Sequence, residues 1–238
     1  MLNYDKDPIK FPIIYDNKFG IDNLEKLLKK EAKCTLFRES EIIKKDLFLK
    51  GPFDLKHLQS IHKHLFQDVY PWAGQIRDGD ITKSNVTFCH FRYIESAMQD
   101  VIKQIKSFDK KNDVKEVANH LAYVSNELNA IHPFREGNGR SKRVFLDRYA
   151  LSMGYDLNLQ NIPAEELKQL EINVYHTNNL TALTNRLMGV MQKVQQQQAV
   201  SPALKSMQAG ARKVQKDMQR GQSNQKANLK QNGGNYMG

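Results

Sequence analysis

Apolar residues recur every three or four positions through most of the chain, a spacing that puts them on one face of an α-helix. Residues 54–67 are the clearest case, and Asp54 can cap their first turn. Further helices are expected at 22–33, in a separate segment that includes Ile42, Ile43 and Leu47, and at 94–108, 113–130, 139–153, 163–173 and 178–195. The pattern therefore predicts a mainly α fold.

One stretch, residues 75–93, departs from the helical spacing. Residues 75–77, Ile81 and residues 86–88 read as short extended segments, with Ser84 and Asn85 at a turn. The segment before them contains the only Trp, next to Pro and Gly, which is typical of a loop anchored on the core. A small β-hairpin is the expected exception among the helices.

The residues between two of these helices, 131–143, combine several kinds of chemistry. His132 can move a proton near neutral pH, and Pro133 prevents the preceding helix from continuing. Gly137 and Gly139 allow left-handed turns and a close approach of the backbone to a ligand. Glu136 is an oxygen ligand of the kind that Mg²⁺ prefers.

A helix predicted to begin at Gly139 or Arg140 would point its free N–H groups back at this loop, and such helix ends bind anions. Arg140 and Arg143 lie one turn apart and can pair with phosphate. Each residue alone also fits a plain Gly-Asn-Gly turn with a capping histidine. Together they indicate a polyphosphate with Mg²⁺, although the loop is neither a Walker P-loop nor a dinucleotide fingerprint.

The composition is that of a globular protein: 40% of the 238 residues are hydrophobic. No run of 18 apolar residues occurs, so no membrane span is expected. The first residues lack an apolar secretion signal of the Sec type, and two cysteines, Cys34 and Cys89, fit a reduced cytosol. We expect a cytoplasmic protein in the producing cell. Secretion into a host by another route would not require a Sec-type signal.

The net charge of +10 is uneven along the chain. From Ala199 onward, seven basic residues stand against Asp217 alone, a net +6. We divide the chain into an N-terminal arm (1–20), a helical domain (21–195) and a basic, Gln-rich, mostly disordered tail (196–238). A basic nucleic-acid-binding module stays an alternative, but no DNA or RNA motif supports it.

The stretch from His132 to Arg143 resembles the motif of the Fic family, His-Pro-Phe-x-Asp/Glu-Gly-Asn-Gly/Lys-Arg-x-x-Arg. Four upstream segments look like the same core: residues 53–55, 62–66, 69–74 and 80–83. The resemblance covers residues 15–190. Within the family, the chain looks most similar to stand-alone bacterial Fic toxins and to the Fic parts of secreted effectors. It implies a Fic-type helical bundle with a small β-hairpin flap over the active site.

The resemblance implies a protein adenylyltransferase that moves AMP from ATP to a Ser, Thr or Tyr hydroxyl of a target protein. His132 would be the general base, and Glu136 would hold Mg²⁺. The implied anion-binding groups are the backbone N–H groups of Gly137, Asn138 and Gly139, the Asn138 side chain, Arg140 and Arg143. A kinase branch of the family has Ala in place of Gly137, so Gly137 favours AMP transfer, and other members use other nucleotide-linked donors.

In the family, the hairpin is a flap that docks the target by strand addition. By resemblance, Lys83 and Thr87 would lie near the nucleotide and Phe88 would clamp the target. The residues that follow, Cys89-His90-Phe91, differ from the usual Ala/Cys-Pro-Pro. Target choice therefore does not follow from the resemblance.

Many Fic proteins carry an inhibitory helix, Ser/Thr-x-x-x-Glu-Gly/Asn, whose Glu pairs with the second arginine of the loop. Thr35 and Glu39 fit this spacing, but Ser40 breaks the last position. So loose a pattern arises easily by chance. The implied arrangement is a separate antitoxin that supplies the Glu, or no such control.

Overall fold

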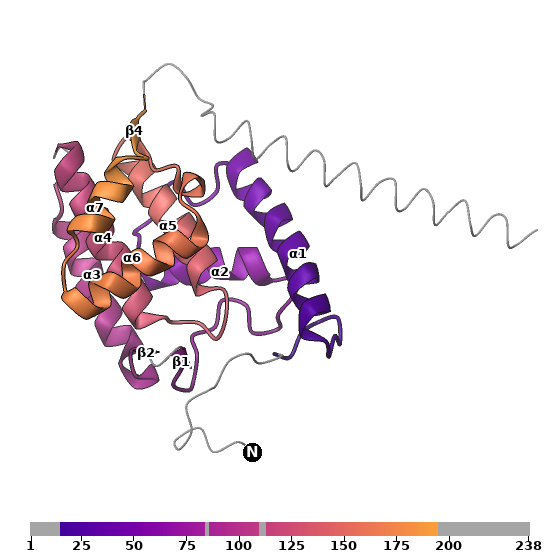
Figure 1. Ribbon diagram of the computed structural model, residues 1–238. Coiled ribbons are helices and arrows are strands. Elements are labelled where there is room, and N and C mark those ends of the chain that lie inside the picture. The colour runs from indigo at the N-terminus through magenta and orange to yellow at the C-terminus, as the bar shows by residue number, and fades with distance from the viewer. Residues whose placement is uncertain (1–14, 84–85, 110–112, 195–238) are drawn as a thin grey trace, which may run out of the picture. The chain divides into compact units, whose positions relative to one another are not determined.

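The computed structural model describes residues 15–83, 86–109 and 113–194. Within these residues the chain forms mainly α-helices, with two small antiparallel strand pairs (Figure 1), which confirms the predicted fold class. The helices are α1 (Leu24–Lys44), α2 (Leu55–Phe66), α3 (Ile94–Ser107), α4 (Val114–Ile131), α5 (Asn138–Ser152), α6 (Ala164–Thr177) and α7 (Thr181–Met188). The strands are β1 (Thr82–Lys83), β2 (Val86–Thr87), β3 (Tyr155–Asp156) and β4 (Gln192–Lys193).

Three predictions fall outside the described part of the chain. These are the disordered tail from residue 196, the first 14 residues of the arm and the turn at Ser84 and Asn85. The rest of the arm packs on the domain: the Tyr15 ring contacts the rings of Tyr70 and Trp72, and the Lys18 N–H donates to the Val69 carbonyl at 2.8 Å. No described helix has both the length and the apolar character that a bilayer crossing requires.

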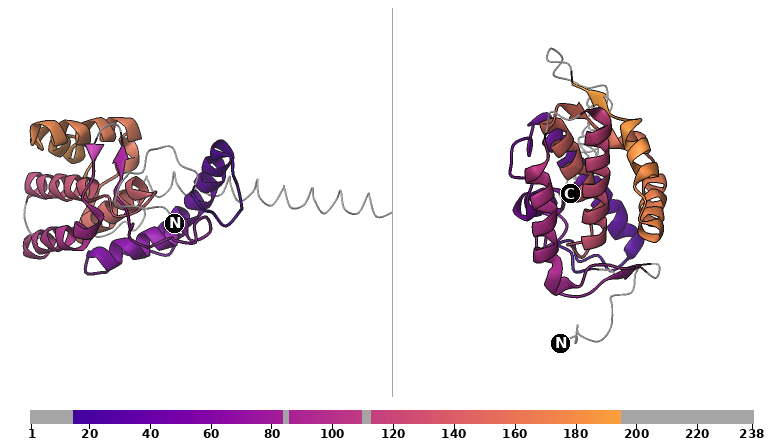
Figure 2. Two further views of the ribbon diagram at one scale, coloured as in Figure 1. Left: turned by 90° about the horizontal axis from the view of Figure 1, so that it is seen from below. Right: turned by 90° about the vertical axis from the view of Figure 1, so that its left-hand side faces the viewer.

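The central helix of the bundle is α4, which packs against α3, α5, α6 and α7, while α2 packs against α1 and α5. Figure 2 shows α1 well away from α3, α4 and α7, with α2 lying between. The β1–β2 pair lies at one end of the bundle and β4 at the other (Figure 1). Fully buried side chains at the centre include Phe66, Phe134, Phe145 and Tyr149.

Helix starts follow their capping residues. The Asp54 carboxylate accepts a hydrogen bond from the His57 N–H at 2.8 Å, which confirms the predicted cap of α2. At α4, Asp113 and Glu116 form a capping box, in which each side chain binds the other's backbone N–H. These caps place α4 so that its far end reaches the loop that begins at His132.

The prediction of two separate helices before residue 50 was wrong, because α1 is one helix of 21 residues. Residues 24–44 contain no Gly or Pro that would end it. The polar pair Glu31 and Thr35, which interrupts the apolar pattern, is buried against the rest of the domain. Arg38 then fastens α1 through two bonds to the Asp68 carboxylate, at 2.6 and 2.7 Å.

In the described part of the hairpin, Thr82 and Lys83 pair with Thr87 and Val86 as strands. The Phe88 N–H also bonds the Ile81 carbonyl at 3.2 Å. The segment at 75–77 was expected to be extended sheet, but it joins no described ladder, since the Arg77 N–H bonds the Pro133 carbonyl at 2.9 Å. The backbone of Arg77 therefore bonds the loop after α4 in place of a neighbouring strand.

The C-terminal helices also differ from the pattern. Helix α6 runs to Thr177 and ends at Asn178 in a left-handed conformation (φ 52°), while α7 covers only eight of the residues expected at 178–195. The chain then turns, and β4 pairs with β3. Gly154, just after α5, supplies the carbonyl that binds the Val194 N–H at 2.9 Å.

Candidate active site

His132 is the residue on which α4 ends. Its backbone is left-handed (φ 49°), and its N–H still bonds the Leu128 carbonyl at 3.1 Å. This conformation is uncommon for a residue other than glycine, and Pro133 follows and prevents helix continuation. The side chain is 8% exposed, and neither ring nitrogen makes a hydrogen bond of normal geometry with a described residue. A buried imidazole whose nitrogens lack such a bond is suited to accept a proton from a ligand.

The surroundings of His132 keep its ring neutral. Burial, followed by the positive charges of Lys83 and Lys142, holds the pKa of His132 well below its usual value, while the Asn129 carbonyl acts in the opposite direction. Both larger effects disfavour the protonated ring. The residue is therefore in its basic form at neutral pH.

The loop after His132 is braced from within by Asn138. The Asn138 Nδ2 donates to the Phe134 carbonyl at 2.7 Å, and its Oδ1 accepts from the Phe134 N–H at 2.9 Å. Phe134 is fully buried and fixes the loop on the core. Since the Asn138 side chain is used in this way, the anion donors of the segment are chiefly backbone N–H groups.

Helix α5 begins at Asn138, earlier than the predicted start at Gly139 or Arg140. In its first turn, the Ser141 N–H donates to the Gly137 carbonyl at 3.1 Å. The N–H groups of Asn138, Gly139 and Arg140 come before this first helical hydrogen bond and have no acceptor within the helix. These groups and the helix dipole form an anion-binding end. The left-handed turn that both glycines would allow occurs at Gly137 and not at Gly139, because the chain has already entered the helix there.

Gly137 is required by both backbone and packing. Its φ is 81°, and a Cβ there would lie 2.3 Å from the buried Phe66 ring. We expect Gly137→Ala to lower the free energy of unfolding by at least about 1–2 kcal/mol from the backbone strain alone, and to weaken ATP binding. Thermal unfolding and calorimetric titration with ATP would measure both. Gly139→Ala is the matched control for unfolding without nucleotide, since a Cβ there meets nothing within 4 Å; equal losses in both variants would contradict the prediction.

His62 supports the loop from α2, a role that the sequence did not indicate beyond packing. Its Nδ1 accepts from the Gly74 N–H at 2.8 Å, so its Nε2 carries the proton and donates to the Glu136 carbonyl at 2.9 Å. Burial lowers the pKa of His62 to about 4. On the other side, the Tyr15 hydroxyl donates to the Arg135 carbonyl at 3.0 Å. Consecutive carbonyls of the loop are thus held by residues far away in sequence.

Glu136 is positioned to serve as a single carboxylate ligand. Its Oε1 accepts from the Gly137 N–H at 2.9 Å, and its Oε2 lies 3.5 Å from the Lys83 Nζ. Among the described residues, no group of three or more His, Cys, Asp or Glu side chains could hold a metal alone. Mg²⁺ is commonly bound by one or two carboxylates plus substrate phosphates, and Glu136 fits that pattern.

Arg140 is held by a buried carboxylate on α1. Its Nη2 lies 2.6 Å from the Glu31 Oε1, and its guanidinium covers the Phe66 ring at 4.6 Å. The Tyr70 hydroxyl also donates to Glu31, which is 2% exposed. The Arg140 side chain itself is 31% exposed. Sequence reasoning missed Glu31, because it lies 109 positions from its partner.

Arg143 forms no ion pair with any described residue, which leaves its charge available to a ligand. The positive charges of Arg140 and Arg143 both act on the Glu39 carboxyl, although burial dominates and raises the pKa of Glu39. Thr35 lies 3.5 Å from the Arg140 Nη1 and also donates to the Glu31 carbonyl. The Thr35–Glu39 stretch of α1 therefore lies beside the arginines of the loop.

The flap residues are not equally close to the loop. The Phe88 ring stacks on the His132 ring, with centroids 3.8 Å apart, and Lys83 reaches Glu136. Thr87 is exposed, and the contact found for its hydroxyl is with the Thr82 hydroxyl at 3.3 Å. The structure thus brings Phe88 and Lys83 to the predicted site and leaves Thr87 at the surface.

A buried ion pair lies behind the loop. The Lys142 ammonium contacts the Glu171 carboxylate of α6, and the Ser125 hydroxyl donates to the same oxygen at 3.0 Å. Lys142 and Glu171 are 5% and 6% exposed. This network joins α4, α5 and α6 immediately behind His132, whose pKa the Lys142 charge lowers.

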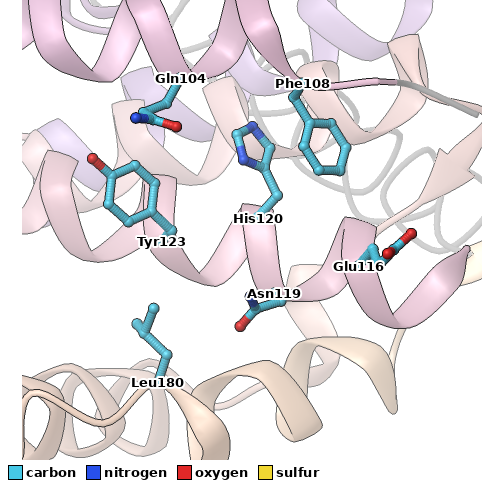
Figure 3. Close-up of a pocket in the computed structure, with 7 residues that line it drawn as sticks. All are labelled: Gln104, Phe108, Glu116, Asn119, His120, Tyr123 and Leu180. Carbon is cyan, nitrogen blue, oxygen red and sulfur yellow. The ribbon is translucent and has the colours of Figure 1, made fainter. Parts of the chain in front are cut away.

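A separate cavity of about 450 Å³ opens between α3, α4 and the start of α7 (Figure 3). None of the predicted site residues lines it. Its walls include His120 stacked on Phe108 at 3.9 Å, with the His120 Nε2 bonded to the Tyr149 hydroxyl at 2.9 Å. Burial lowers the pKa of His120 to about 4, so this histidine is a neutral packing residue.

The fold and the loop together define a helical protein with an anion-binding helix end beside a histidine base. Residues 52–150 match the family model described as the Fic/DOC family. The chain is 35% identical over 170 residues to a "Probable protein adenylyltransferase Fic" from Salmonella typhimurium. The match covers 69% of this chain and 82% of that protein. The chain belongs to the Fic/DOC family.

Two further matches come from Bartonella. The chain is 36% identical over 174 residues to "Protein adenylyltransferase VbhT" of Bartonella schoenbuchensis; the match covers 71% of this chain but only 36% of that protein. The BepC effector protein of Bartonella tribocorum, solved with bound AMPPNP, shares the fold at a TM-score of 0.68 and 21% identity, over 81% of this chain and 98% of that one.

Proposed function

We propose that the chain is a protein adenylyltransferase, which transfers AMP from ATP to a Ser, Thr or Tyr hydroxyl of a target protein. One observation carries the proposal: the buried ring of His132, whose nitrogens make no hydrogen bond of normal geometry with a described residue, lies a few residues before a helix end that offers three N–H groups and Arg143 to an anion. A base and a phosphate site so placed suit phosphoryl-type chemistry, which depends on positioning and electrostatics. The names of the Salmonella and Bartonella relatives agree with this reaction.

In the proposed reaction, His132 takes the proton of the target hydroxyl, whose oxygen then bonds to the α-phosphorus of ATP. The bond between the α-phosphorus and the bridging oxygen breaks, and pyrophosphate leaves. The N–H groups at the start of α5, with Arg140 and Arg143, stabilise the negative charge on the phosphates. Glu136 would hold Mg²⁺, which supplies charge neutralisation on the phosphates when bound.

For control, we propose a separate antitoxin-like protein that supplies a glutamate to Arg143. The proposal is supported by the absence of an ion pair between Arg143 and any described residue. Such a carboxylate would compete with the terminal phosphate for the same charge. The setting would be the producing cell or, after secretion, a host.

The test uses ATP labelled at one phosphate. The purified chain is incubated with Mg²⁺, bacterial lysate and α-³²P-ATP, beside a His132→Ala control. We expect a discrete labelled protein band that the control lacks and that γ-³²P-ATP does not produce. Label from γ-³²P-ATP alone, or from another nucleotide donor alone, would replace AMP transfer by phosphate transfer or by another donor.

A further inference from the structure

Arg77 lies where the flap meets the active-site loop. Its side chain is completely buried, and its three nitrogens donate to backbone carbonyls on both sides of this junction. On the loop side, Nε bonds the His132 carbonyl at 2.8 Å and Nη2 the Ile131 carbonyl at 3.2 Å. On the flap side, Nη1 bonds the Gly79 carbonyl at 2.6 Å and Nη2 also bonds the Cys89 carbonyl. One guanidinium thus binds four carbonyls on three chain segments.

Two backbone bonds reinforce the junction. The Arg77 N–H donates to the Pro133 carbonyl and the Cys89 N–H to the Ala130 carbonyl, both at 2.9 Å. The flap is therefore fastened to the end of α4 at its beginning and at its end. Phe88, the residue before Cys89, is placed by this attachment with its ring on His132.

The contacts suit a guanidinium and no other side chain. The carbonyls of Ile131 and His132 lie at the C-terminal end of α4, where helical acceptors lack intrahelical partners and the helix dipole is negative. Asp80, the carboxylate paired with Arg77, lies 3.7 Å away and is partly exposed, so the pair is secondary to the carbonyl contacts. A planar fork of five donors can reach four carbonyls, whereas an ammonium offers only three protons from one point.

We propose that Arg77 is a positioning residue for the transfer reaction, which holds the His132 backbone in its left-handed conformation and keeps Phe88 against its ring. The inference rests on the proposed function only for the transfer step; the geometry that it describes exists without nucleotide. Arg77 contacts none of the phosphate-binding residues of α5 in the described chain. Its loss therefore affects the base and the flap and leaves the nucleotide site in place.

The test compares Arg77→Lys and Arg77→Gln with Arg186→Lys, a matched guanidinium-to-ammonium change on α7, where Arg186 pairs with Glu166 of α6. The readouts are the rate of AMP label transfer, the Kd for ATP with Mg²⁺, and the ring-proton resonances of His132, assigned by NMR against His132→Ala. Stacking on Phe88 shifts these resonances upfield. Thermal unfolding shows which variants are folded.

For Arg77→Lys we expect transfer to fall on the order of 10- to 100-fold, because small misplacements of a reacting group have costs of this size. The Kd for ATP should stay within about 3-fold, as expected for an intact helix end, and the upfield shift of His132 should diminish. Arg186→Lys should leave all three unchanged. If the wild-type chain shows no transfer, the proposed function fails while the NMR comparison still decides the positioning role.

Two results would overturn the inference. One is an unchanged His132 resonance with wild-type transfer in both Arg77 variants. The other is a loss of transfer that parallels losses of ATP binding and thermal stability, without a specific change at His132; Arg77 would then stabilise the domain in general.

Discussion

Replacing His132 with alanine is expected to lower AMP transfer by about 10²–10⁴-fold, the usual contribution of a general base. ATP binding should be nearly unchanged, because the donors at the start of α5 and Arg143 are separate groups. Initial rates of label transfer and calorimetric titration with ATP would measure the two effects. His176→Ala, a change at an exposed histidine of α6, is the matched control and should keep the wild-type rate.

The same assay run against pH sharpens this test. Burial and the charges of Lys83 and Lys142 lower the pKa of His132, so the ring stays deprotonated as the pH falls through 6.5. The wild-type rate should therefore begin to fall only well below pH 6.5. Substantial transfer by His132→Ala, or an acid limb at pH 6.5 or above, would exclude His132 as the base.

Replacing Glu171 with alanine is expected to destabilise the domain by about 3–5 kcal/mol, the cost of leaving a buried charge without its partner. The Lys142 ammonium, 5% exposed, would lose the carboxylate that it contacts, and the Ser125 hydroxyl would lose its acceptor. Chemical denaturation gives the free energy of unfolding directly.

The double variant Lys142→Met/Glu171→Leu is the matched control, because it removes both charges and keeps apolar volume. It should unfold at nearly the wild-type denaturant concentration or higher, since exchanging a buried ion pair for apolar side chains is often neutral or stabilising. A double variant as unstable as Glu171→Ala would mean that side-chain packing, and not the unpaired charge, accounts for the loss.

The helices could be predicted well where local pattern and local caps agreed. The apolar spacing of 54–67 and the carboxylate of Asp54 are both contained in one short segment, and α2 forms as expected. The prediction failed at α1, where the buried Glu31 interrupts the apolar pattern. Glu31 is buried because it binds Arg140 and Tyr70, and neither partner is visible from the sequence around it.

In the candidate site too, the local motif could be predicted and its distant partners could not. The residues from His132 to Arg143 are contiguous, so their motif was readable, and helix α5 does begin within them. The residues that hold them come from elsewhere: Tyr15, His62, Arg77 and Glu171. In the sequence, nothing connects this tyrosine, histidine, arginine and glutamate with the loop; only His62 lies in a segment that resembles the Fic core.

By itself, the sequence determined the class of fold, the place of the loop and the residue types that can move a proton and bind phosphate. These properties depend on helical periodicity, on capping and on a short motif, all of which act over a few neighbouring residues. The tertiary structure alone decided that His132 is buried with its ring against Phe88, that Asn138 braces the loop and that Arg77 joins the flap to α4. Burial, hydrogen-bond partners and local charge depend on segments up to 120 positions apart, and only folding brings those segments together.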